Sequence, residues 1–277
     1  GDIVLTTSPL KTIRNRFPKA QISYVTLEEF APLLEFHPDI DRLIPISKNM
    51  TGTNLWEFSD YIRKQNYSTI FDLHNSLRSN IITFRTTRPV LQLKKPRWNR
   101  FMLFQFHQNI FADDFSTRKM YHEHLGKIWQ EGDEIPNTSL KVTNHEKNEA
   151  LSFVGEDSYI TLIPGAAWGQ KQWSSDKYIE LIQDINMSVV LLGEKKDKIC
   201  FQIANKVPSV INLAGKTSLR QALAILSNSK HVIGSDTGLT HAAEALRIPV
   251  SMIQGPTSKE TGAGVHLENS RNIEKNL

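Results

Sequence analysis

One stretch of the sequence, residues 232–250, is decisive for the fold: Val232-Ile-Gly-Ser-Asp-Thr-Gly-Leu-Thr-His-Ala-Ala-Glu-Ala-Leu-Arg-Ile-Pro-Val250. Its pattern predicts the end of a buried strand, a tight turn between Gly234 and Gly238, a short helix over Thr240–Arg247 and a second buried strand, because Pro249 ends the helix. The first turn of a helix presents free backbone N–H groups and a partial positive charge. We therefore expect this turn to bind a phosphorylated or nucleotide ligand.

Outward from this stretch, short apolar segments alternate with amphipathic ones along the chain. The predicted strands are Gln21–Val25, Thr69–Leu73, Tyr159–Ile163, Val189–Leu192, Val210–Leu213, His231–Gly234 and Val250–Ile253. The predicted helices are Pro9–Phe17, Ser76–Arg85, Ser116–Trp129, Asp176–Asn186, Ser218–Ser229 and Thr240–Arg247. Such alternation predicts an α/β protein with parallel sheets covered by helices.

The alternation breaks twice. Residues 86–115 are basic and aromatic without a clear period, and residues 130–157 are polar, charged and turn-rich. We place a domain boundary near residue 150, which divides the chain into domains 1–150 and 151–277.

Length and composition limit the possible functions. The 277 residues are enough for two domains, and the net charge of +4 suits an anionic ligand without indicating nucleic acid. Cys200 is the only cysteine, so no disulfide can form within the chain and a reducing cytoplasm is the simplest location. We expect neither a membrane helix nor a signal peptide, because no apolar run approaches the required length.

A second informative stretch is Leu162-Ile-Pro-Gly-Ala-Ala-Trp-Gly-Gln-Lys-Gln-Trp-Ser174, between a predicted strand and a predicted helix. Gly165, Ala166 and Ala167 would let the backbone approach a ligand, and Lys171 would bring a charge suited to pyrophosphate. The alternative is a solvated lysine between two packed tryptophans. A site becomes the better interpretation if this loop and the 234–241 turn follow neighbouring strands.

Other candidate residues follow the remaining strands of the second half. Glu194 lies just past a strand end, where a carboxylate can hold ribose hydroxyls, or it is a residue of a helix start. Thr217 could line an adenine pocket, or it is the N-cap of the next helix. The dinucleotide fingerprint G-x-G-x-x-G is missing, which disfavours a nicotinamide-dependent oxidoreductase.

The first half offers weaker signals. His74, Ser76 and Arg78 could contact an acceptor molecule or merely cap a helix. Two interpretations fit Arg88–Phe106: a surface that faces anionic lipid, or a solvated basic loop over aromatic side chains. His122-Glu-His124 lacks the spacing of a helical zinc pair, so we predict no metal site.

Further motifs run along nearly the whole chain: Gly1-Asp-Ile-Val-Leu-Thr-Thr7, Arg14-Asn-Arg-Phe-Pro18, Ala31-Pro-Leu-Leu34, His37-Pro-Asp39, Phe71-Asp-Leu-His-Asn-Ser-Leu-Arg-Ser79, Pro164-Gly-Ala-Ala-Trp168, Lys171-Gln-Trp173, Leu213-Ala-Gly215, Gly234–His241 and Gly255-Pro-Thr-Ser258. In this order and spacing the chain resembles the bacterial heptosyltransferases of lipopolysaccharide core assembly, glycosyltransferase family 9.

The resemblance implies a GT-B fold, in which two Rossmann-like domains face a central cleft. Domain 1–150 would bind the acceptor and domain 151–277 the sugar nucleotide. The implied activity is inverting, metal-independent transfer of a heptose from ADP-heptose to the inner core of lipopolysaccharide in the Gram-negative cell envelope, without a cofactor. The family pattern also includes a strand before Gly1-Asp2 and a helix after Leu277, which this sequence does not contain.

The resemblance also implies roles for individual residues. Asp2 matches the proposed catalytic base, and Lys171 would offset charge on the departing ADP, together with the backbone N–H groups of Thr237, Gly238 and Leu239. The other donor-binding candidates are Ala166, Ala167, Glu194, Thr217, Asp236 and His241. Because a carboxylate beside pyrophosphate would repel it, we expect Asp236 to face sugar hydroxyls or to brace the loop. The acceptor-binding candidates are His74, Ser76, Arg78 and Arg118.

The implied partners are ADP-heptose and an anionic lipopolysaccharide core, with no nucleic acid. The implied location is the cytoplasm, with peripheral contact at the inner membrane as a further option. Two other functions fit a fold of this kind: a sugar-nucleotide epimerase, and a non-catalytic nucleotide-sugar-binding protein. The epimerase would turn over its donor without an acceptor.

Overall fold

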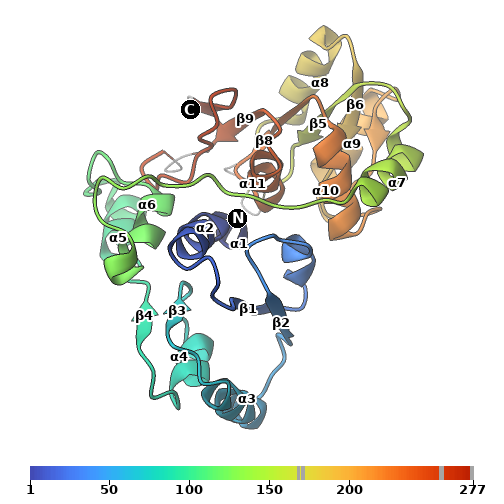
Figure 1. The fold of residues 1–277 in the computed structure, drawn as a ribbon. Helices are drawn as coiled ribbons and strands as arrows, with labels where there is room; N and C mark the ends of the chain where they lie inside the picture. Colours follow the sequence, from blue (N-terminus) through green and yellow to red (C-terminus); the bar gives the residue numbers. More distant parts are fainter. Residues whose placement is uncertain (167–168, 170–171, 256–258, 275–277) are drawn as a thin grey trace. The chain divides into compact units, whose positions relative to one another are not determined.

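A computed structural model describes residues 1–166, 169, 172–255 and 259–274 of the chain (Figure 1). The chain divides into two compact units. Unit 1 contains Gly1–Thr7, Pro32–Pro38 and Asn137–Leu277, and unit 2 contains Ser8–Ala31 and Asp39–Pro136.

Unit 1 is built on a six-stranded parallel sheet with strand order β10-β9-β8-β5-β6-β7. Five of its strands match predicted ones, and β10 was not predicted. Their bounds are β5 Tyr159–Ile163, β6 Ser188–Leu191, β7 Ile211–Asn212, β8 His231–Ser235, β9 Val250–Gln254 and β10 Arg271–Glu274. The chain runs outward from β5 through β6 to β7, then crosses back to β8 on the other side of β5. The strand order therefore reverses between β5 and β8, which is where open α/β sheets bind ligands.

The core of unit 1 forms on both faces of this sheet. All five residues of β5 are buried, so both of its faces are covered. On one face Ile160 and Leu162 pack with side chains of α8 and α9, and on the other the Tyr159 hydroxyl donates to Ile225 O of α10 at 2.6 Å. Burial raises the pKa of the Cys200 thiol to about 12, which argues against a nucleophilic role. The helices of unit 1 are α1 Asp2–Leu5, α7 Asn144–Val154, α8 Ser175–Asp184, α9 Lys198–Lys206, α10 Leu219–Asn228 and α11 Gly238–Ala245.

Helix α7 corrects the prediction that residues 144–156 are turn-rich. Thr143 and Glu146 form a reciprocal capping box, which satisfies backbone N–H groups at the start of the helix. Ala150 and Val154 are buried, and α7 packs against α10, where Asn228 Nδ2 donates to Lys147 O at 2.8 Å. A mostly polar helix is thus held by its cap and by one narrow apolar stripe.

The unit boundaries differ from the single division predicted near residue 150. The chain leaves unit 2 at Pro136, because α7 packs on α10 of unit 1. The first seven residues also belong to unit 1, because α1 packs on α11. Both differences result from packing between segments that are far apart in sequence. Such packing leaves no change in composition along the chain, so the sequence did not predict it.

Unit 2 contains two separate pairs of parallel strands, β1 Ser23–Leu27 with β2 Arg42–Ile46 and β3 Ile70–Asp72 with β4 Val90–Gln92. Its helical segments are α2 Thr7–Arg16, α3 Gly52–Lys64, α4 Leu77–Thr83, α5 Arg97–Phe106, α6 Thr117–Glu123 and the 3-10 turn η2 Gly126–Ile128. A second 3-10 turn, η1 Ala31–Leu34, lies mostly in unit 1. Strands β2 and β4 and helices α3, α5 and α9 were not predicted; α5 falls in the region predicted to lack a period.

Arg220 joins three segments of unit 1. Its guanidinium forms two hydrogen bonds of 2.6 Å to the Glu146 carboxylate and also donates to Pro32 O at 3.2 Å and Lys141 O at 3.0 Å. The hydrogen bonds from Arg220, and then those from Thr143, hold the pKa of Glu146 down at about 2. Such a paired arginine fixes the path of the chain at Pro32 and Lys141.

We expect the Glu146 pair to make stability fall in acid. Its carboxyl has a folded-state pKa of about 2 against an ordinary value of 4.5, so the contribution is complete above about pH 5 and is lost as the pH falls towards 2. Glu146→Gln should lower the free energy of unfolding at pH 7 by about 1 to 2 kcal/mol and flatten this slope. Urea unfolding from pH 7 to pH 3 measures both effects. Glu149→Gln, an exposed carboxylate of the same helix, is the control, and an equal slope in both variants would contradict the assignment.

Candidate functional site

The loops after β5 and β8 meet at the carboxyl edge of the sheet in unit 1. Ile163 pairs with Gly234 in the parallel ladder, which confirms that the two loops follow neighbouring strands. Beyond the ladder, Ser235 Oγ donates to Pro164 O at 3.4 Å. In the loop after β5, Gln172 Nε2 donates to Ala166 O at 3.2 Å. Residues 164–166 and 235–239 are therefore next to each other where the strand order reverses.

The turn between β8 and α11 does not cap the helix with the side chain of its N-cap residue. Thr240 Oγ1 donates to Ser235 O at 2.7 Å and lies 3.1 Å from Thr237 Oγ1. Thr237 is the N-cap residue, yet its side chain accepts no hydrogen bond from a backbone N–H of the helix. The first N–H groups of α11, including those of Gly238 and Leu239, are thus not capped by Thr237. Free N–H groups at a helix start suit a phosphate.

The buried His241 pairs with the partly buried Asp236 beside this helix start. Asp236 Oδ1 lies 3.2 Å from His241 Nε2, and the histidine side chain is 3% exposed. Two roles were predicted for Asp236, to face sugar hydroxyls or to brace the loop. Its contact with His241 is of the second kind, because it links the turn to α11. His241 Nδ1 is buried and has no hydrogen-bond partner among the described residues. A buried polar atom without a partner is costly, so we expect this nitrogen to pair with a polar group that the described residues do not supply.

Helix α1 brings Asp2 to the same place. A Cβ added to Gly1 would lie 3.5 Å from His241 Cδ2, and a Cβ added to Gly238 would lie 3.0 Å from the backbone nitrogen of Gly1. Asp2 follows directly and is exposed. The structure therefore brings together Asp2, Asp236, His241 and the start of α11, although more than 230 residues separate Asp2 from the others.

Asp197 is a residue of this edge that the sequence analysis missed. Its Oδ2 accepts from Glu194 N at 2.7 Å, so it closes the turn after β6. A Cβ on Gly165 would lie 2.5 Å from Asp197 Cγ, and a Cβ on Gly193 would lie 2.8 Å from Asp197 Oδ2. The carboxylate thus fills the space that the two glycines leave between the β5 and β6 loops. Its signal in the sequence, an aspartate three residues after Glu194, is common to many turns.

Glu194 and Thr217 follow β6 and β7 on the same edge. Glu194 is exposed, and its carboxylate lies 2.8 Å from Lys196 Nζ, so its side chain points to solvent near another exposed group. Thr217 is half-buried and is not the helix cap, because Ser218 caps α10 in a capping box with Gln221. The alternative interpretation of Thr217 as the N-cap is therefore wrong, while its predicted part in an adenine pocket stays a prediction.

The predicted acceptor residues lie in unit 2, around the starts of α4 and α6. Asp72, at the end of β3, accepts from the backbone N–H groups of His74 at 3.1 Å and Asn75 at 2.8 Å. Ser76 caps α4, so the capping alternative holds for this residue. Arg78 donates to Lys48 O at 2.6 Å, and Arg118 donates to Pro136 O at 3.5 Å.

Two predicted donor-site residues, Ala167 and Lys171, lie outside the described residues. Within the described ranges, no group of three or more His, Cys, Asp or Glu side chains could hold a metal ion. His122, half of the rejected His-x-His pair, instead lies 3.0 Å from Thr12 Oγ1 and 2.8 Å from Arg118 O. Over the same ranges, no helix combines the length and the apolar character needed to cross a membrane.

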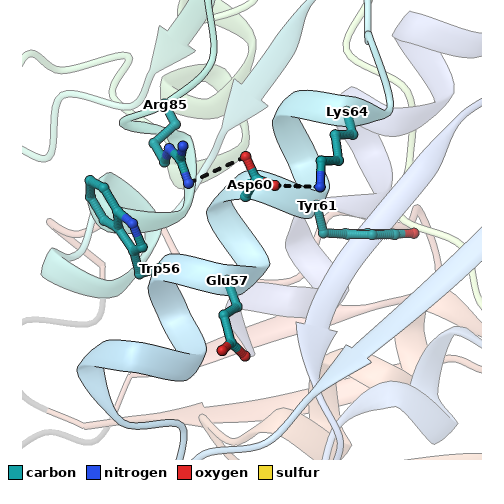
Figure 2. A pocket seen from close by; sticks show the side chains of 6 residues that line it. All are labelled: Trp56, Glu57, Asp60, Tyr61, Lys64 and Arg85. Carbon is teal, nitrogen blue, oxygen red and sulfur yellow. Dashed lines mark ion pairs between the residues drawn. The ribbon is translucent and has the colours of Figure 1, made fainter.

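A hollow on α3 in unit 2 contains none of the predicted residues. Figure 2 shows Asp60 between Lys64 and Arg85, and Trp56, Glu57 and Tyr61 complete the lining. The Asp60 carboxylate lies 2.7 Å from Lys64 Nζ and 3.3 Å from Arg85 Nη1, and Arg63 binds it as well. Hydrogen bonds from Lys64 and then Arg63 lower the pKa of Asp60 to about 2. The Asp60 carboxylate is already paired with three cations, so we assign no ligand to this hollow.

Comparisons with known proteins identify the family and the fold of the chain. The family model described as "Glycosyltransferase family 9 (heptosyltransferase)" matches residues 55–273. Lipopolysaccharide heptosyltransferase 2 of Escherichia coli K12 is 25% identical over 94% of this chain and 81% of its own length. A family 9 glycosyl transferase from Veillonella parvula superposes with a TM-score of 0.83 at 19% identity, covering 99% of this chain and 83% of that one. An E. coli heptosyltransferase solved with ADP-2-deoxy-2-fluoro heptose has a TM-score of 0.68 at 19% identity, covering 99% and 89%. The structural likenesses show the α/β fold of the GT-B type that the motifs implied.

Proposed function

Because the chain belongs to glycosyltransferase family 9 (heptosyltransferase), we propose that it transfers a heptose from ADP-heptose to the inner core of lipopolysaccharide. One observation carries the proposal: the exposed Asp2 carboxylate, the Asp236–His241 pair and the uncapped start of α11 lie together at the point where the strand order reverses. This combination supplies a base beside a phosphate-binding helix start.

On this proposal the donor lies along the carboxyl edge of the sheet in unit 1. The N–H groups of Thr237, Gly238 and Leu239 bind pyrophosphate oxygens, and the backbone at Ala166 and Ala167 approaches them from the β5 loop. Lys171 adds a positive charge at the leaving group. Glu194 holds the ribose and Thr217 the adenine. Asp236 keeps its link to His241, whose Nδ1 is left to accept a hydrogen bond from a hydroxyl of the donor.

The chemistry proposed is a single displacement. An acceptor hydroxyl oxygen attacks the anomeric carbon and forms the new C–O bond, while the bond from that carbon to the phosphate oxygen breaks. The hydroxyl proton passes to Asp2, and the electron pair of the broken bond leaves with ADP. Attack opposite the leaving group inverts the anomeric carbon. The start of α11 and Lys171 stabilise the charge that develops on ADP, so the proposal requires neither a metal ion nor a cofactor.

The acceptor proposed for unit 2 is the anionic core of lipopolysaccharide, which Arg78 and Arg118 would attract and His74 would orient, since Ser76 caps α4. The reaction would take place in the cytoplasm, with peripheral contact at the cytoplasmic face of the inner membrane.

Incubation of the full chain with ADP-heptose and a core acceptor tests the proposal. We expect ADP release to match the gain of one heptose by the acceptor in mass spectra, and ADP alone to bind in calorimetry. Each alternative has its own signature: an epimerase would convert the donor without an acceptor, and a binding protein would bind it without turnover. Absence of both ADP binding and transfer would refute the proposal.

A further inference from the structure

Helix α5 in unit 2 exposes a row of large aromatic side chains. Trp98 is 64% exposed, Phe101 46%, Phe104 50% and Phe106 58%, whereas Leu103 on the inner side is only 4% exposed. Adjacent exposed aromatic residues are uncommon on a soluble surface and generally mark an interaction site. We propose that this α5 surface, defined as Trp98, Phe101, Phe104 and Phe106 with Lys94, Lys95, Arg97 and Arg100, docks on an anionic lipid bilayer.

Three of these aromatic side chains contact one another. Trp98 stacks on Phe101 with ring centroids 5.5 Å apart, and Phe106 meets the Phe101 ring edge-on at 5.7 Å. The helix that carries them is labelled in Figure 1 and is followed by His107 in the left-handed conformation, which ends it. A short helix with aromatic rings on its outer side is suited to lie in the plane of a membrane interface.

The charges of the segment that contains α5 favour a negatively charged membrane surface. Residues 73–112 contain seven Lys and Arg and no Asp or Glu, although the whole chain carries only +4. The rest of the chain is therefore net negative. Among the residues that the structure describes, none of Lys94, Lys95, Arg97 and Arg100 forms an ion pair. Each cation close to an anionic leaflet contributes about 1 kcal/mol to binding.

The other exposed aromatic group of unit 2 lacks this combination. The ring centroids of Trp56 and Phe84 are 6.2 Å apart. The Arg85 guanidinium, however, lies 4.9 Å from the centroid of the Trp56 ring, and its Nη1 is 3.3 Å from the Asp60 carboxylate (Figure 2). Its charge is thus partly neutralised, whereas the cations of the α5 surface are not. A second copy of the chain is also a poor partner, because a symmetric contact would bring two strongly basic segments together.

The proposal needs no catalytic activity, because it rests on the exposure and charge of α5. Its connection with a lipid-anchored acceptor rests on the proposed function. Docking would confine the search for such an acceptor to the membrane plane, so the rate with bilayer acceptor should depend on α5 and the rate with detergent-dispersed acceptor should not.

Co-sedimentation of the full chain with lipid vesicles tests the proposal. We expect binding to vesicles of phosphatidylcholine with phosphatidylglycerol, weaker binding to phosphatidylcholine alone, and loss of binding as salt rises. Phe101→Ser with Phe104→Ser should lower the partition coefficient at least about tenfold, because two apolar side chains no longer enter the interface. Phe201→Ser is the matched control, because Phe201 is 40% exposed on α9 of unit 1. Circular dichroism checks that every variant is folded.

Three further variants separate the electrostatic and the apolar contributions to vesicle binding. Lys94→Gln with Lys95→Gln should weaken binding to anionic vesicles several-fold without changing binding to phosphatidylcholine, and Lys141→Gln with Lys230→Gln should leave both unchanged. Lipids brominated in the acyl chain should quench tryptophan fluorescence in the native chain. Trp98→Phe should keep vesicle binding and lose most of this quenching, since the ring that enters the interface is no longer a fluorophore.

Three results would overturn the proposal: vesicle binding that the α5 variants do not reduce, quenching that persists in Trp98→Phe, or a dimer that Phe101→Ser with Phe104→Ser dissociates while vesicles fail to bind. The last result would make α5 a protein interface. Failure of the proposed function is distinguishable, since a chain that binds vesicles through α5 but transfers no heptose would refute the activity alone.

Discussion

Asp2→Asn is expected to lower kcat for heptose transfer by about a thousandfold, because an amide cannot accept the proton of the attacking hydroxyl. The substitution keeps the size of the side chain and leaves α1 packed on α11. The affinity for ADP should therefore change by less than about twofold, since the groups proposed to bind pyrophosphate belong to other segments. Steady-state kinetics with saturating acceptor, together with calorimetric titration of ADP, measure the two quantities.

The control for this prediction is Asp157→Asn, an exposed carboxylate in the turn before β5. It removes the same charge from unit 1 and should leave kcat unchanged. If Asp2→Asn retains native kcat, or loses ADP binding in parallel with activity, Asp2 is not the base.

Gly234→Ala should destabilise unit 1 by about 2 to 3 kcal/mol and abolish detectable ADP binding at the concentrations that saturate the native chain. A Cβ at this position would lie 2.8 Å from both Ile163 Cβ and Ile163 O, and 3.2 Å from Thr240 Oγ1. The first two atoms belong to a buried strand, so they cannot move without separating β5 from β8. The third holds the turn that opens the start of α11. The midpoint of urea unfolding reports the loss of stability.

Gly52→Ala is the matched control for this substitution. Gly52 is the first residue of α3, and a Cβ there would have no atom within 4 Å. The change should alter stability by less than about 0.5 kcal/mol, or raise it slightly, because alanine is the better helix former. Equal unfolding midpoints for the two variants would show that close packing at Gly234 is not what joins the two loops.

Much of unit 1 could be predicted from local pattern. Strand β5 has the predicted bounds Tyr159–Ile163, and β8, β9 and α11 lie where the 232–250 stretch placed them, with the helix starting two residues earlier at Gly238. These elements are apolar, short and bounded by glycine or proline, so local sequence alone determines them. The neighbouring position of the β5 and β8 loops was also predicted and is confirmed.

Prediction failed where tertiary contacts stabilise an element of unfavourable composition. Helix α7 reads as a polar turn region because it has few apolar residues, yet its cap and its packing on α10 make it helical. Helix α5 has aromatic side chains on its exposed side, which obscures the apolar period expected for a buried face. Strand β10 is exposed at all four residues and is defined only by pairing with β9.

For the site, the sequence by itself determined the kinds of chemical group: a glycine-bounded turn before a helix, an aspartate-histidine motif, and an acidic residue near the start of the chain. These depend on residue type and short spacing, which the linear order contains. Only the tertiary structure decided that α1 packs on α11, that Asp197 fills the space between Gly165 and Gly193, and that His241 meets Asp236 while its Nδ1 has no partner among the described residues. The physical reason is that these contacts join segments that come together when the sheet and its helices are buried. The free energy of that burial depends on the packed core as a whole and on no single local stretch.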